Sequence, residues 1–399
     1  MSLKVKVSAI GLLDMLKFKN QTKVREKTIE KGAETPLPSS YAANALAEKM
    51  HPRAQKMTVC EIIPRADDVK TFVLRTENGQ SAAPFSAGQY ISFSMEAQGS
   101  VFTRPVSLCS SPALARQGIY AVTVKRAGFG SNAMFEQFVP GQTVTVSAPL
   151  GNFYHSSLRD ANTVLALAGG IGITPFVSMA HAIADGEENF SLTILYGTPT
   201  LAQAYFKEEL EELCRRSGGK VRFAHVLSAE KRDGCEHGLL SAELIRKYMP
   251  DAPCSLFLAG PQAMYRFLDG ELAALGLEQK WVRHELFGAA GDPASLPGYP
   301  PAEHTGKHYT VTLQRENERL TFPAAANEPL LVAIERAAIS ANSHCRSGEC
   351  GWCRTRLLRG NVFVPQERDA RRAADRLFGY IHPCISYPLS DITLALSNP

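Results

Sequence analysis

The sequence predicts a multidomain protein in which an antiparallel β-barrel precedes an α/β domain with a doubly wound parallel sheet, followed by a small α+β domain. The chain has 399 residues, which is too many for a single hydrophobic core, so several domains are expected. Strand patterns come first without helices, then alternate with helical stretches, and a cysteine-rich loop lies near the C-terminus. The expected parts are an N-terminal extension (1–52), the barrel (53–155), the α/β domain (156–290), a linker (291–306) and the α+β domain (307–399).

The N-terminal extension is basic. Residues 1–31 hold eight Lys or Arg against three Asp or Glu, whereas the whole chain has a net charge of +4. The residues from Tyr41 to Met50 follow a short helical pattern. We interpret the extension as a solvated, partly ordered tail, with an anionic membrane or an acidic partner as alternatives. No zinc-finger or aromatic–basic motif is present, so we expect no nucleic-acid partner.

The composition predicts a protein of the cytoplasm. No run of 18 apolar residues exists, so no transmembrane segment is expected. The N-terminus lacks the long apolar core and the cleavage site of a signal peptide. In a reducing compartment the nine cysteines are metal ligands and ordinary thiols rather than disulfides.

The pattern of β-branched and aromatic residues places the predicted elements. The barrel strands are expected within 57–76, 87–95, 118–126 and 141–149. Buried strands of the α/β domain are expected at 162–168, 191–197, 220–228, 254–260 and 280–287, with helical stretches at 201–218 and 262–276. A Pro- and Gly-rich stretch then predicts the linker, and a hairpin (308–322) and a short helix (330–339) open the last domain.

The most specific motif is HCRSGECGWC near the C-terminus. Cys345, Cys350 and Cys353 give C-x4-C-x2-C, and Cys384 follows at a distance, which is the plant-type spacing of a [2Fe–2S] cluster. Glycines within the loop let its backbone bend and offer N–H groups to the sulfurs. A four-cysteine zinc site, which usually has two C-x2-C pairs, and plain structural thiols are the alternatives. The other five cysteines have no ligand-like spacing.

Two glycine-rich turns predict sites for phosphate groups. Gly169-Gly170-Ile171-Gly172-Ile173-Thr174-Pro175 follows an apolar strand and opens a helix, the context that a nucleotide-binding turn requires. Gly128-Phe129-Gly130-Ser131-Asn132 lies between two barrel strands. Its glycines allow close approach to a phosphate, and Ser131 is expected to cap a helix whose N-terminus attracts the anion.

Together these motifs resemble the ferredoxin–NADP reductase superfamily, in the subgroup with a plant-type ferredoxin domain at the C-terminus. Its domain order is like that of phthalate dioxygenase reductase and of the phenylacetyl-CoA epoxygenase reductase. The resemblance covers about 53–399. It implies that the barrel binds a flavin, that the α/β domain binds a nicotinamide dinucleotide, and that the last domain is a β-grasp ferredoxin. The extension has no counterpart in the resemblance.

The resemblance assigns the flavin site. Arg104-Pro105-Val106-Ser107 resembles the family motif R-x-Y-S, so Arg104 would bind the flavin phosphate and Ser107 would lie beside N5. Val106 departs from the family, where most members have a tyrosine that stacks on the ring. The flavin residues implied are Arg104, Val106, Ser107, Lys125, Gly130, Ser131 and Asn132. FAD is favoured by a helix that faces a pyrophosphate, and FMN is the alternative.

The resemblance also assigns the nicotinamide site. The residues implied are Gly170, Gly172, Thr174, Tyr196, Gly260 and Pro261. Ala259 replaces the cysteine of the family's C-G-P loop. Thr198-Pro199-Thr200 offers no basic side chain for a 2′-phosphate, which favours NADH over NADPH. Glu285 matches a family acid near the flavin, so Ser107 and Glu285 are the candidate catalytic residues; an ordinary surface residue is the alternative for Glu285.

The function implied is a reductase that takes hydride from NAD(P)H onto the flavin and passes electrons through the cluster to a protein acceptor, an oxygenase or another metalloprotein. The alternative is a non-catalytic electron-transfer subunit or redox sensor. The last domain is rich in arginine, which predicts an acceptor with an acidic surface. These arginines are Arg346, Arg354, Arg356, Arg359, Arg368, Arg371, Arg372 and Arg376.

Overall fold

The computed structural model describes residues 9–32, 41–288, 292–300, 306–315 and 318–396, and the chain divides into two compact units, Met1–Lys49 and Met50–Pro399. The first unit contains helix α1 (Ala9–Gly32), and helix α2 (Ala42–Met50) follows. Helix α2 confirms the short helix predicted there. Helix α1 was not predicted, because its apolar and charged residues follow no clear helical period. Among the described helices, none is long and apolar enough to cross a membrane.

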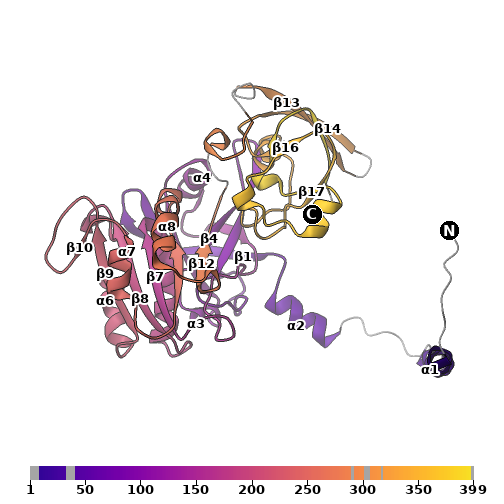
Figure 1. Cartoon of the computed structure of the whole chain (residues 1–399), viewed down its shortest axis with the longest axis horizontal. Helices are drawn as coiled ribbons and strands as arrows, with labels where there is room; N and C mark the ends of the chain where they lie inside the picture. Colours follow the sequence, from indigo (N-terminus) through magenta and orange to yellow (C-terminus); the bar gives the residue numbers. More distant parts are fainter. Residues whose placement is uncertain (1–8, 33–40, 289–291, 301–305, 316–317, 397–399) are drawn as a thin grey trace. The chain divides into compact units, whose positions relative to one another are not determined.

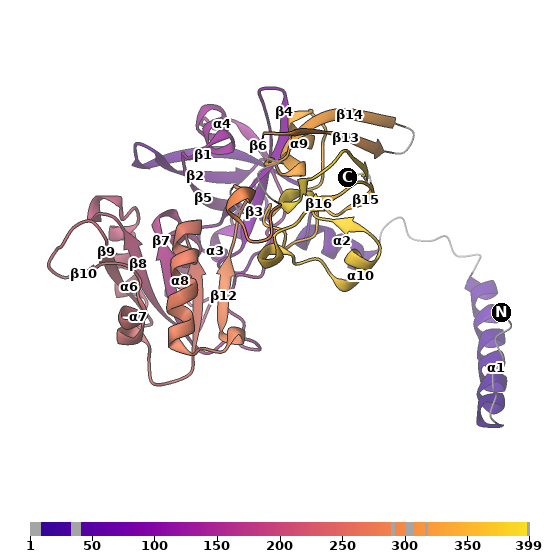
Figure 2. The ribbon, with the colours of Figure 1, turned by 45° about the horizontal axis from the view of Figure 1, so that its top comes forward.

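The second unit opens with the predicted barrel, drawn in purple in Figures 1 and 2. Its six antiparallel strands lie in the order β4-β3-β6-β1-β2-β5. The strands are β1 (Gln55–Ala66), β2 (Val69–Thr76), β3 (Tyr90–Ala97), β4 (Ser100–Ser107), β5 (Ile119–Lys125) and β6 (Thr143–Val146). The backbone N–H of Cys109, just beyond β4, bonds to the carbonyl oxygen of Ala121 in β5, and this link between the two edge strands closes the sheet.

Two helices accompany the barrel, α3 (Pro112–Ala115) and α4 (Phe129–Gln137). Helix α4 buries Ala133 and Met134 in the barrel core, where Phe138 packs edge-on against Phe72 at 5.2 Å. The N-terminus of α4 is thereby held at the rim of the barrel beside strand β4.

The α/β domain confirms the predicted doubly wound parallel sheet. Its strand order is β10-β9-β8-β7-β11-β12, and every pair is parallel. The strands are β7 (Thr163–Gly169), β8 (Ser191–Thr198), β9 (Val221–Leu227), β10 (Glu236–His237), β11 (Cys254–Ala259) and β12 (Val282–Glu285). The chain order reverses between β7 and β11, and a sheet of this kind binds ligands in the crevice at the carboxyl ends of such strands.

Four helices cover the two faces of this sheet: α5 (Thr174–Ala184), α6 (Lys207–Arg216), α7 (Ala242–Tyr248) and α8 (Gln262–Leu275). Alternate residues of β7 face opposite sides, so Val164 and Ala166 pack with α5 and α6, whereas Leu165 and Leu167 pack with α7 and α8. The helical stretch predicted from 201 opens with a short 3-10 helix (Leu201–Gln203) and becomes an α-helix only at Lys207, because the side chains of Tyr205 and Phe206 between them turn into the core.

The C-terminal domain, orange to yellow in Figure 1, has a five-stranded mixed sheet in the order β14-β13-β19-β15-β17. Its elements are β13 (His308–Arg315), β14 (Glu318–Ala325), α9 (Leu330–Arg336), β15 (Thr355–Arg359), α10 (Ala373–Leu377), β17 (Tyr380–Ile381) and β19 (Ile392–Ala395). A further pair joins β16 (Val362–Phe363) to β18 (Tyr387–Pro388). The central strands β13 and β19 are parallel, and α9 packs its buried face on the sheet, which is the β-grasp arrangement.

Part of the predicted linker lies outside the described residues, namely 291 and 301–305. The described part, 292–300, packs on the C-terminal domain: Leu296 contacts Phe363 and Tyr387, and the hydroxyl of Tyr299 donates to the carbonyl of Ala326 at 3.1 Å. The domain bounds that we expect from the sequence therefore stay a proposal at this segment.

Candidate functional site: a flavin strand, a nucleotide crevice and a four-cysteine loop

Strand β4 carries the two residues assigned to the flavin. It pairs with β3 so that Ser107 lies opposite Tyr90 and Arg104 opposite Phe93. The guanidinium of Arg104 stacks on the ring of Phe102, 4.7 Å from its centroid. Arg104 also passes directly over Gly130, since a Cβ on Gly130 would lie 2.2 Å from its Nε. The structure thus brings Arg104 to the N-terminus of α4, as anion binding there requires.

Ser131 stabilises that helix end differently from the prediction. Helix α4 begins at Phe129 after the cap residue Gly128, so Ser131 is the third helical residue and not the cap. Its hydroxyl oxygen accepts hydrogen bonds from the backbone N–H groups of Ala127 (2.8 Å) and Gly128 (3.0 Å). Ser131 therefore fixes the turn that leads into the helix, the second half of a capping box.

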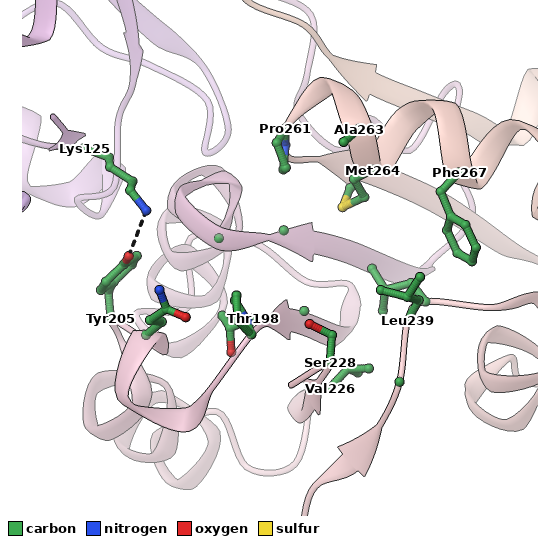
Figure 3. Close-up of a pocket in the computed structure, with 17 residues that line it drawn as sticks. Lys125, Thr198, Tyr205, Val226, Ser228, Leu239, Pro261, Ala263, Met264 and Phe267 are labelled. Atoms are coloured by element: carbon green, nitrogen blue, oxygen red, sulfur yellow. Dashed lines mark hydrogen bonds between the residues drawn. The ribbon is translucent and has the colours of Figure 1, made fainter. Parts of the chain in front are cut away.

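Two other residues assigned to the flavin site, Asn132 and Lys125, form contacts away from the N-terminus of α4. The side-chain oxygen of Asn132 accepts a hydrogen bond from Nε of Arg126 at 3.0 Å. The ammonium group of Lys125 lies 3.3 Å from the hydroxyl of Tyr205 and 3.5 Å from a carboxylate oxygen of Asp68. Lys125 therefore reaches across from the barrel to the α/β domain, where it lines the nucleotide crevice (Figure 3).

The two candidate catalytic residues meet although they are 178 positions apart. The hydroxyl of Ser107 donates to Oε2 of Glu285 at 2.7 Å. Oε1 of Glu285 is buried and has no hydrogen-bond partner among the described residues. The hydroxyl of Tyr265 bonds to the backbone carbonyl of Glu285 at 2.5 Å and so holds the end of strand β12 in place. An orphaned buried carboxyl oxygen indicates a missing polar partner, and a flavin ring edge supplies one.

Burial raises the pKa of Glu285 to about 8, although the Ser107 hydrogen bond opposes this effect; the negative charge of Glu349 raises it further. The carboxyl is therefore mostly protonated at neutral pH. A neutral carboxyl can donate its proton from one oxygen while it accepts the Ser107 hydrogen bond at the other. This pair can hold a proton at the place that the resemblance assigns to the flavin ring.

A cavity of about 370 Å³ lies against Glu285 and is lined from all three domains of the second unit. Tyr90 and Phe153 are among the lining residues from the barrel side, Glu285 and Phe287 are among those from strand β12 and beyond, and the cluster loop contributes four residues. The loop residues are Cys345, Glu349, Cys350 and Trp352. Two of the four candidate iron ligands therefore line the same cavity as the candidate flavin residue.

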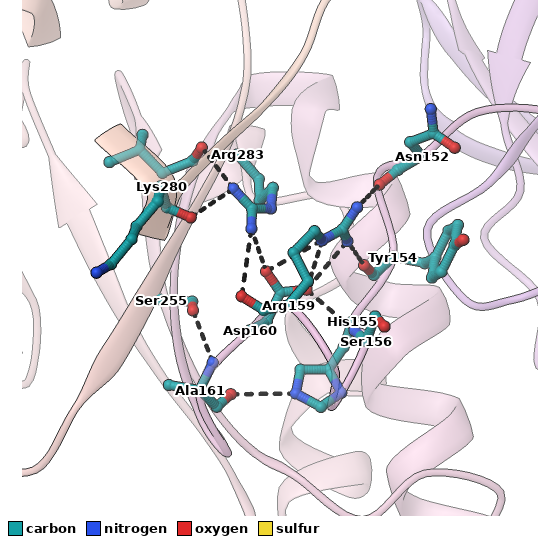
Figure 4. A network of polar contacts seen from close by, with 11 residues as sticks. Asn152, Tyr154, His155, Ser156, Arg159, Asp160, Ala161, Ser255, Lys280 and Arg283 are labelled. Atoms are coloured by element: carbon teal, nitrogen blue, oxygen red, sulfur yellow. Dashed lines mark hydrogen bonds and ion pairs between the residues drawn. The ribbon is translucent and has the colours of Figure 1, made fainter. Parts of the chain in front are cut away.

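A buried ion network, which the sequence analysis missed, positions strand β12 (Figure 4). The carboxylate of Asp160 is fully buried and pairs with Arg283 at 2.8 Å and with Arg159 at 3.0 Å. Arg283 lies on β12, two residues before Glu285, and also donates to the carbonyl of Lys280 at 2.8 Å. The three charges join the segment that leaves the barrel to the strand that carries Glu285. No local pattern in the sequence pairs residues so far apart.

The nucleotide crevice lies at the carboxyl ends of β7, β8, β9 and β11, with a volume of about 440 Å³ (Figure 3). Gly170 and Pro261, two of the residues that the resemblance implies, line it together with Thr198 and with residues that were not predicted. These are Gln203, Tyr205, Val226, Ser228, Gly238, Leu239, Leu240, Ala263, Met264 and Phe267. Lys125 is its only basic lining residue among those that the structure describes.

Close packing explains the glycines of the two loops. A Cβ on Gly172 would lie 2.2 Å from the carbonyl oxygen of Ala259, and one on Gly260 would lie 2.7 Å from the sulfur of Met264. Gly170 has φ +53°, a left-handed conformation that favours glycine. The loops after β7 and β11 can therefore meet at the switch point of the sheet only because these positions lack side chains.

Two of the predicted nicotinamide residues, Tyr196 and Thr174, do not line the crevice. The side chain of Tyr196 is fully buried in the hydrophobic core beside the sheet, and the crevice is lined by its neighbours Gly197 and Thr198. Thr174 is the first residue of α5, where its hydroxyl donates to the carbonyl of Ile171 at 3.1 Å. Thr174 therefore stabilises the turn and does not line the cavity.

The four predicted iron ligands come together as two pairs. The thiol of Cys350 donates to the sulfur of Cys345, and the sulfurs of Cys353 and Cys384 lie 3.4 Å apart. Among the described residues, no three His, Cys, Asp or Glu side chains converge as a single metal ion requires. Two pairs of thiols suit a cluster with two irons, each held by two thiolates, better than one tetrahedral zinc.

Hydrogen bonds within the loop support the thiolate form of Cys345. The hydrogen bond from the Cys350 thiol, followed by those from Ser347, lowers the pKa of Cys345 against the effect of burial. The backbone N–H groups of Ser347 and Cys350 each lie 3.4 Å from the Cys345 sulfur. Gly348 has φ +93° and packs against the carbonyl of Arg368, and Nδ1 of His382 lies 2.7 Å from the carbonyl oxygen of Gly348. The second cysteine segment thus anchors the first, and the residues fit a plant-type cluster.

We expect the ionisation of Glu285 to make stability depend on pH. The folded-state pKa of about 8 lies above the usual value of 4.5, so this carboxyl stabilises the fold fully below pH 4.5, and the contribution is lost as the pH rises through 8. Glu285→Gln should therefore melt at a higher temperature than wild type at pH 9, and the difference should shrink toward pH 5. Thermal melts at both pH values measure it. Glu278→Gln, an exposed carboxylate paired with Lys280 at 2.9 Å, is the control. Parallel pH profiles for wild type and Glu285→Gln would contradict the prediction.

The comparisons with known proteins agree with this geometry. Residues 56–155 match the oxidoreductase FAD-binding domain, residues 166–269 the oxidoreductase NAD-binding domain, and residues 313–389 the 2Fe-2S iron-sulfur cluster binding domain. In this order the three domains define an oxidoreductase with FAD, NAD and [2Fe–2S] sites, as predicted.

Relatives share the full arrangement. The chain is 29% identical over 350 residues, 84% of its length and 94% of the relative's, to the ferredoxin reductase component of 3-ketosteroid-9-alpha-monooxygenase from Mycobacterium tuberculosis. It is 26% identical over 349 residues to the reductase component of glycine betaine monooxygenase from Chromohalobacter salexigens, covering 84% of this chain and 93% of that one. The solved structure of phthalate dioxygenase reductase covers 86% of this chain and 98% of its own at 24% identity, with a TM-score of 0.62. The chain thus carries an FAD-binding, an NAD-binding and a 2Fe-2S domain in this order, and it is similar over most of its length to reductase components of oxygenases.

Proposed function

We propose that this reductase oxidises NADH and delivers electrons through FAD and the [2Fe–2S] cluster to the metalloprotein component of an oxygenase in the cytoplasm. The observation that carries the proposal is the shared cavity of about 370 Å³, where Glu285 of the flavin site and Cys345 and Cys350 of the cluster loop line one space. The ferredoxin reductase component of 3-ketosteroid-9-alpha-monooxygenase, among other relatives, supports an oxygenase as the partner. The nine free thiols support a reducing compartment.

The flavin, when bound, accepts a hydride and releases electrons singly, which the cluster can carry. The protein's residues align these groups. Arg104 and the N-terminus of α4 at Gly130 would hold the flavin phosphate, and Ser107 with the protonated Glu285 would hold a proton beside the ring. Pro261 and Gly170 shape the crevice in which the dinucleotide lies. The thiolates of Cys345, Cys350, Cys353 and Cys384 would hold the irons.

We expect NADH to give a higher kcat/KM than NADPH with ferricyanide as acceptor. The crevice beside Thr198 offers Ser228 and Gln203 but no guanidinium, so a 2′-phosphate would lose its hydration without gaining an ionic partner. Lys125, the basic lining residue, is already engaged by Tyr205 and Asp68. Steady-state rates with both nucleotides measure this, and faster turnover of NADPH would reverse the assignment.

The same assay tests the alternative of a non-catalytic electron-transfer subunit. That function is favoured by Val106, which cannot stack on the ring as a tyrosine does, and by Ala259 in place of cysteine. The fully formed nucleotide crevice of about 440 Å³ favours the enzyme. Turnover of NADH with ferricyanide supports the reductase; a protein that binds flavin but leaves NADH unoxidised supports the alternative.

The acceptor would dock on an exposed surface of the ferredoxin domain, here called the arginine surface, formed by Arg354, Arg356, Arg372, Arg376, Leu377 and Phe378. Leu377 and Phe378 are 79% and 61% exposed. Arg354 follows the ligand Cys353 directly and pairs with Asp375 of α10 at 3.0 Å, so this surface lies close to the cluster loop. An apolar centre with a basic rim fits an acidic partner.

Charge reversal should separate docking from catalysis. Arg371 is a poor site because it is half-buried and bonded to Asp369 at 2.7 Å and to the carbonyl of Tyr380 at 3.2 Å. Arg356→Glu with Arg372→Glu should slow reduction of acidic cytochrome b5, used as a probe, by about tenfold at low salt and by less at high salt. Ferricyanide turnover should not change. Arg319→Glu on β14, at the opposite edge of the sheet, is the control. Salt-independent transfer in all variants would contradict an electrostatic docking surface.

A further inference from the structure

A buried ion pair holds the cluster loop. Glu335 on helix α9 is 4% exposed, and Arg346, next to the ligand Cys345, is 7% exposed. One guanidinium nitrogen of Arg346 lies 2.8 Å from Oε2 of Glu335, and the other contacts Oε1, so the pair is bidentate. Arg346 has φ +60°, a backbone conformation that residues other than glycine rarely adopt. The pair therefore keeps the loop in a backbone conformation that it would not adopt unaided.

The Arg346–Glu335 pair also contacts strand β4 of the barrel. Arg346 donates to the carbonyl oxygen of Thr103 on strand β4 at 3.3 Å, and the hydroxyls of Thr103 and Ser343 lie 2.5 Å apart. Arg104 donates to the same carbonyl of Thr103 at 2.7 Å and lies 3.9 Å from Oε2 of Glu335. The carboxylate of Glu335 thus stands between a guanidinium of the ferredoxin domain and the guanidinium assigned to the flavin phosphate.

The charges of Arg346, Arg104 and Glu335 do not balance. Two guanidiniums share one carboxylate, which leaves one positive charge in a region with little solvent. Burial, aided by the charge of Arg346, lowers the pKa of Arg104 to about 10, and Glu335 opposes this effect. A buried excess of positive charge calls for an anion, and the N-terminus of α4 lies beside Arg104. The phosphate of a bound flavin would supply that anion.

We propose that Glu335 is a positioning residue that fastens the cluster loop to the flavin-binding strand. The inference rests on the proposed function, because its role is to set the path between flavin and cluster. Through Arg346 the carboxylate orients the loop that bears Cys345, and through Thr103 and Arg104 it joins that loop to β4. Loss of the carboxylate leaves Arg346 without its partner, so the ferredoxin domain separates from the barrel and electron transfer slows.

The test is Glu335→Gln in the full-length protein loaded with FAD and iron. Anaerobic stopped-flow with NADH should show flavin reduction at the wild-type rate and cluster reduction slowed by at least about tenfold. Small-angle scattering should give a larger radius of gyration than for wild type, a readout that does not depend on turnover. Glu335→Asp, which keeps the charge, should recover part of the rate. Glu328→Gln is the matched control, because Glu328 pairs with Arg336 at 2.8 Å inside the ferredoxin domain.

The outcomes are separable. If wild type reduces its flavin but Glu335→Gln transfers to the cluster just as fast, with unchanged scattering, the positioning role is wrong. If NADH does not reduce the wild-type flavin at all, the proposed function itself fails. Should Glu335→Gln lose its iron, Thr103→Val removes only the hydroxyl contact to Ser343 and should slow cluster reduction about two- to threefold; an unchanged rate there contradicts the proposal.

Discussion

Cys350→Ser should abolish the iron–sulfur cluster and reduce the rate of cytochrome b5 reduction by at least about a hundredfold, because the one-electron carrier is lost. Ferricyanide turnover with NADH should stay within about threefold of wild type. The reason is the separation of the hydrophobic cores. The barrel and α/β cores are built from residues 57–286, and the ferredoxin cores from residues 296–396.

Cys350 is a suitable site for this test because its side chain is exposed, so serine fits without a cavity. Cys60→Ser is the control, since Cys60 is an exposed thiol on β1 far along the chain from the loop. Iron and sulfide analysis, flavin content and both activities should be measured on the same preparations. A variant that loses its flavin together with its iron would show that the domains do not fold independently.

Gly172→Ala should raise the KM for NADH by at least about tenfold, since an overpacked contact costs about 1–3 kcal/mol and about 1.4 kcal/mol is a factor of ten. The added Cβ would lie 2.2 Å from the carbonyl oxygen of Ala259 and 2.6 Å from the backbone nitrogen of Gly260. Both are backbone atoms of the neighbouring loop and cannot rotate away. The loops after β7 and β11 must therefore separate, which disrupts the crevice where the dinucleotide lies.

Gly270→Ala is the matched control. Gly270 lies within α8, and a Cβ there meets nothing within 4 Å, so alanine should be neutral or slightly stabilising. Gly170→Ala should have an intermediate effect, because its φ of +53° is strained for alanine although the space is open. Steady-state kinetics and thermal melts should show the largest loss for Gly172→Ala, a smaller loss for Gly170→Ala and no loss for Gly270→Ala. Equal KM values for Gly172→Ala and Gly270→Ala would contradict the close-packing account.

The sequence predicted most of what depends on local spacing. The thiols of HCRSGECGWC and Cys384 meet as expected, because the ligand spacing within one loop leaves the chain few arrangements. The turn at Gly169–Pro175 opens a helix at Thr174 for a similar reason, since a proline in the first helical turn suits that start. The domain order and the first two fold classes followed from strand patterns that first occur without helices and then alternate with helices along the chain. The resemblance added the β-grasp fold of the last domain.

Contacts between distant segments could not be predicted in this way. Nothing local links Arg346 to Glu335 and Arg104, or Asp160 to Arg283, and these networks position the cluster loop and strand β12. Tyr196 is buried because helices cover the face of the sheet to which its side chain points, whereas the resemblance concerned only its position at the strand end. The resemblance thus assigned strand β4 to the flavin, and the three-dimensional structure added the contacts of Arg346 with Glu335 and Thr103 on which the proposed link to the cluster loop rests.

The most direct test of the account is anaerobic reduction of the wild-type protein by NADH, with flavin absorbance and the EPR signal of the reduced cluster followed together. The account predicts that the flavin bleaches first and that the cluster signal grows afterwards. With flavin removed, NADH should leave the cluster oxidised. A cluster that NADH reduces equally fast in the flavin-free protein, or a flavin that stays oxidised under excess NADH, would contradict the central claim.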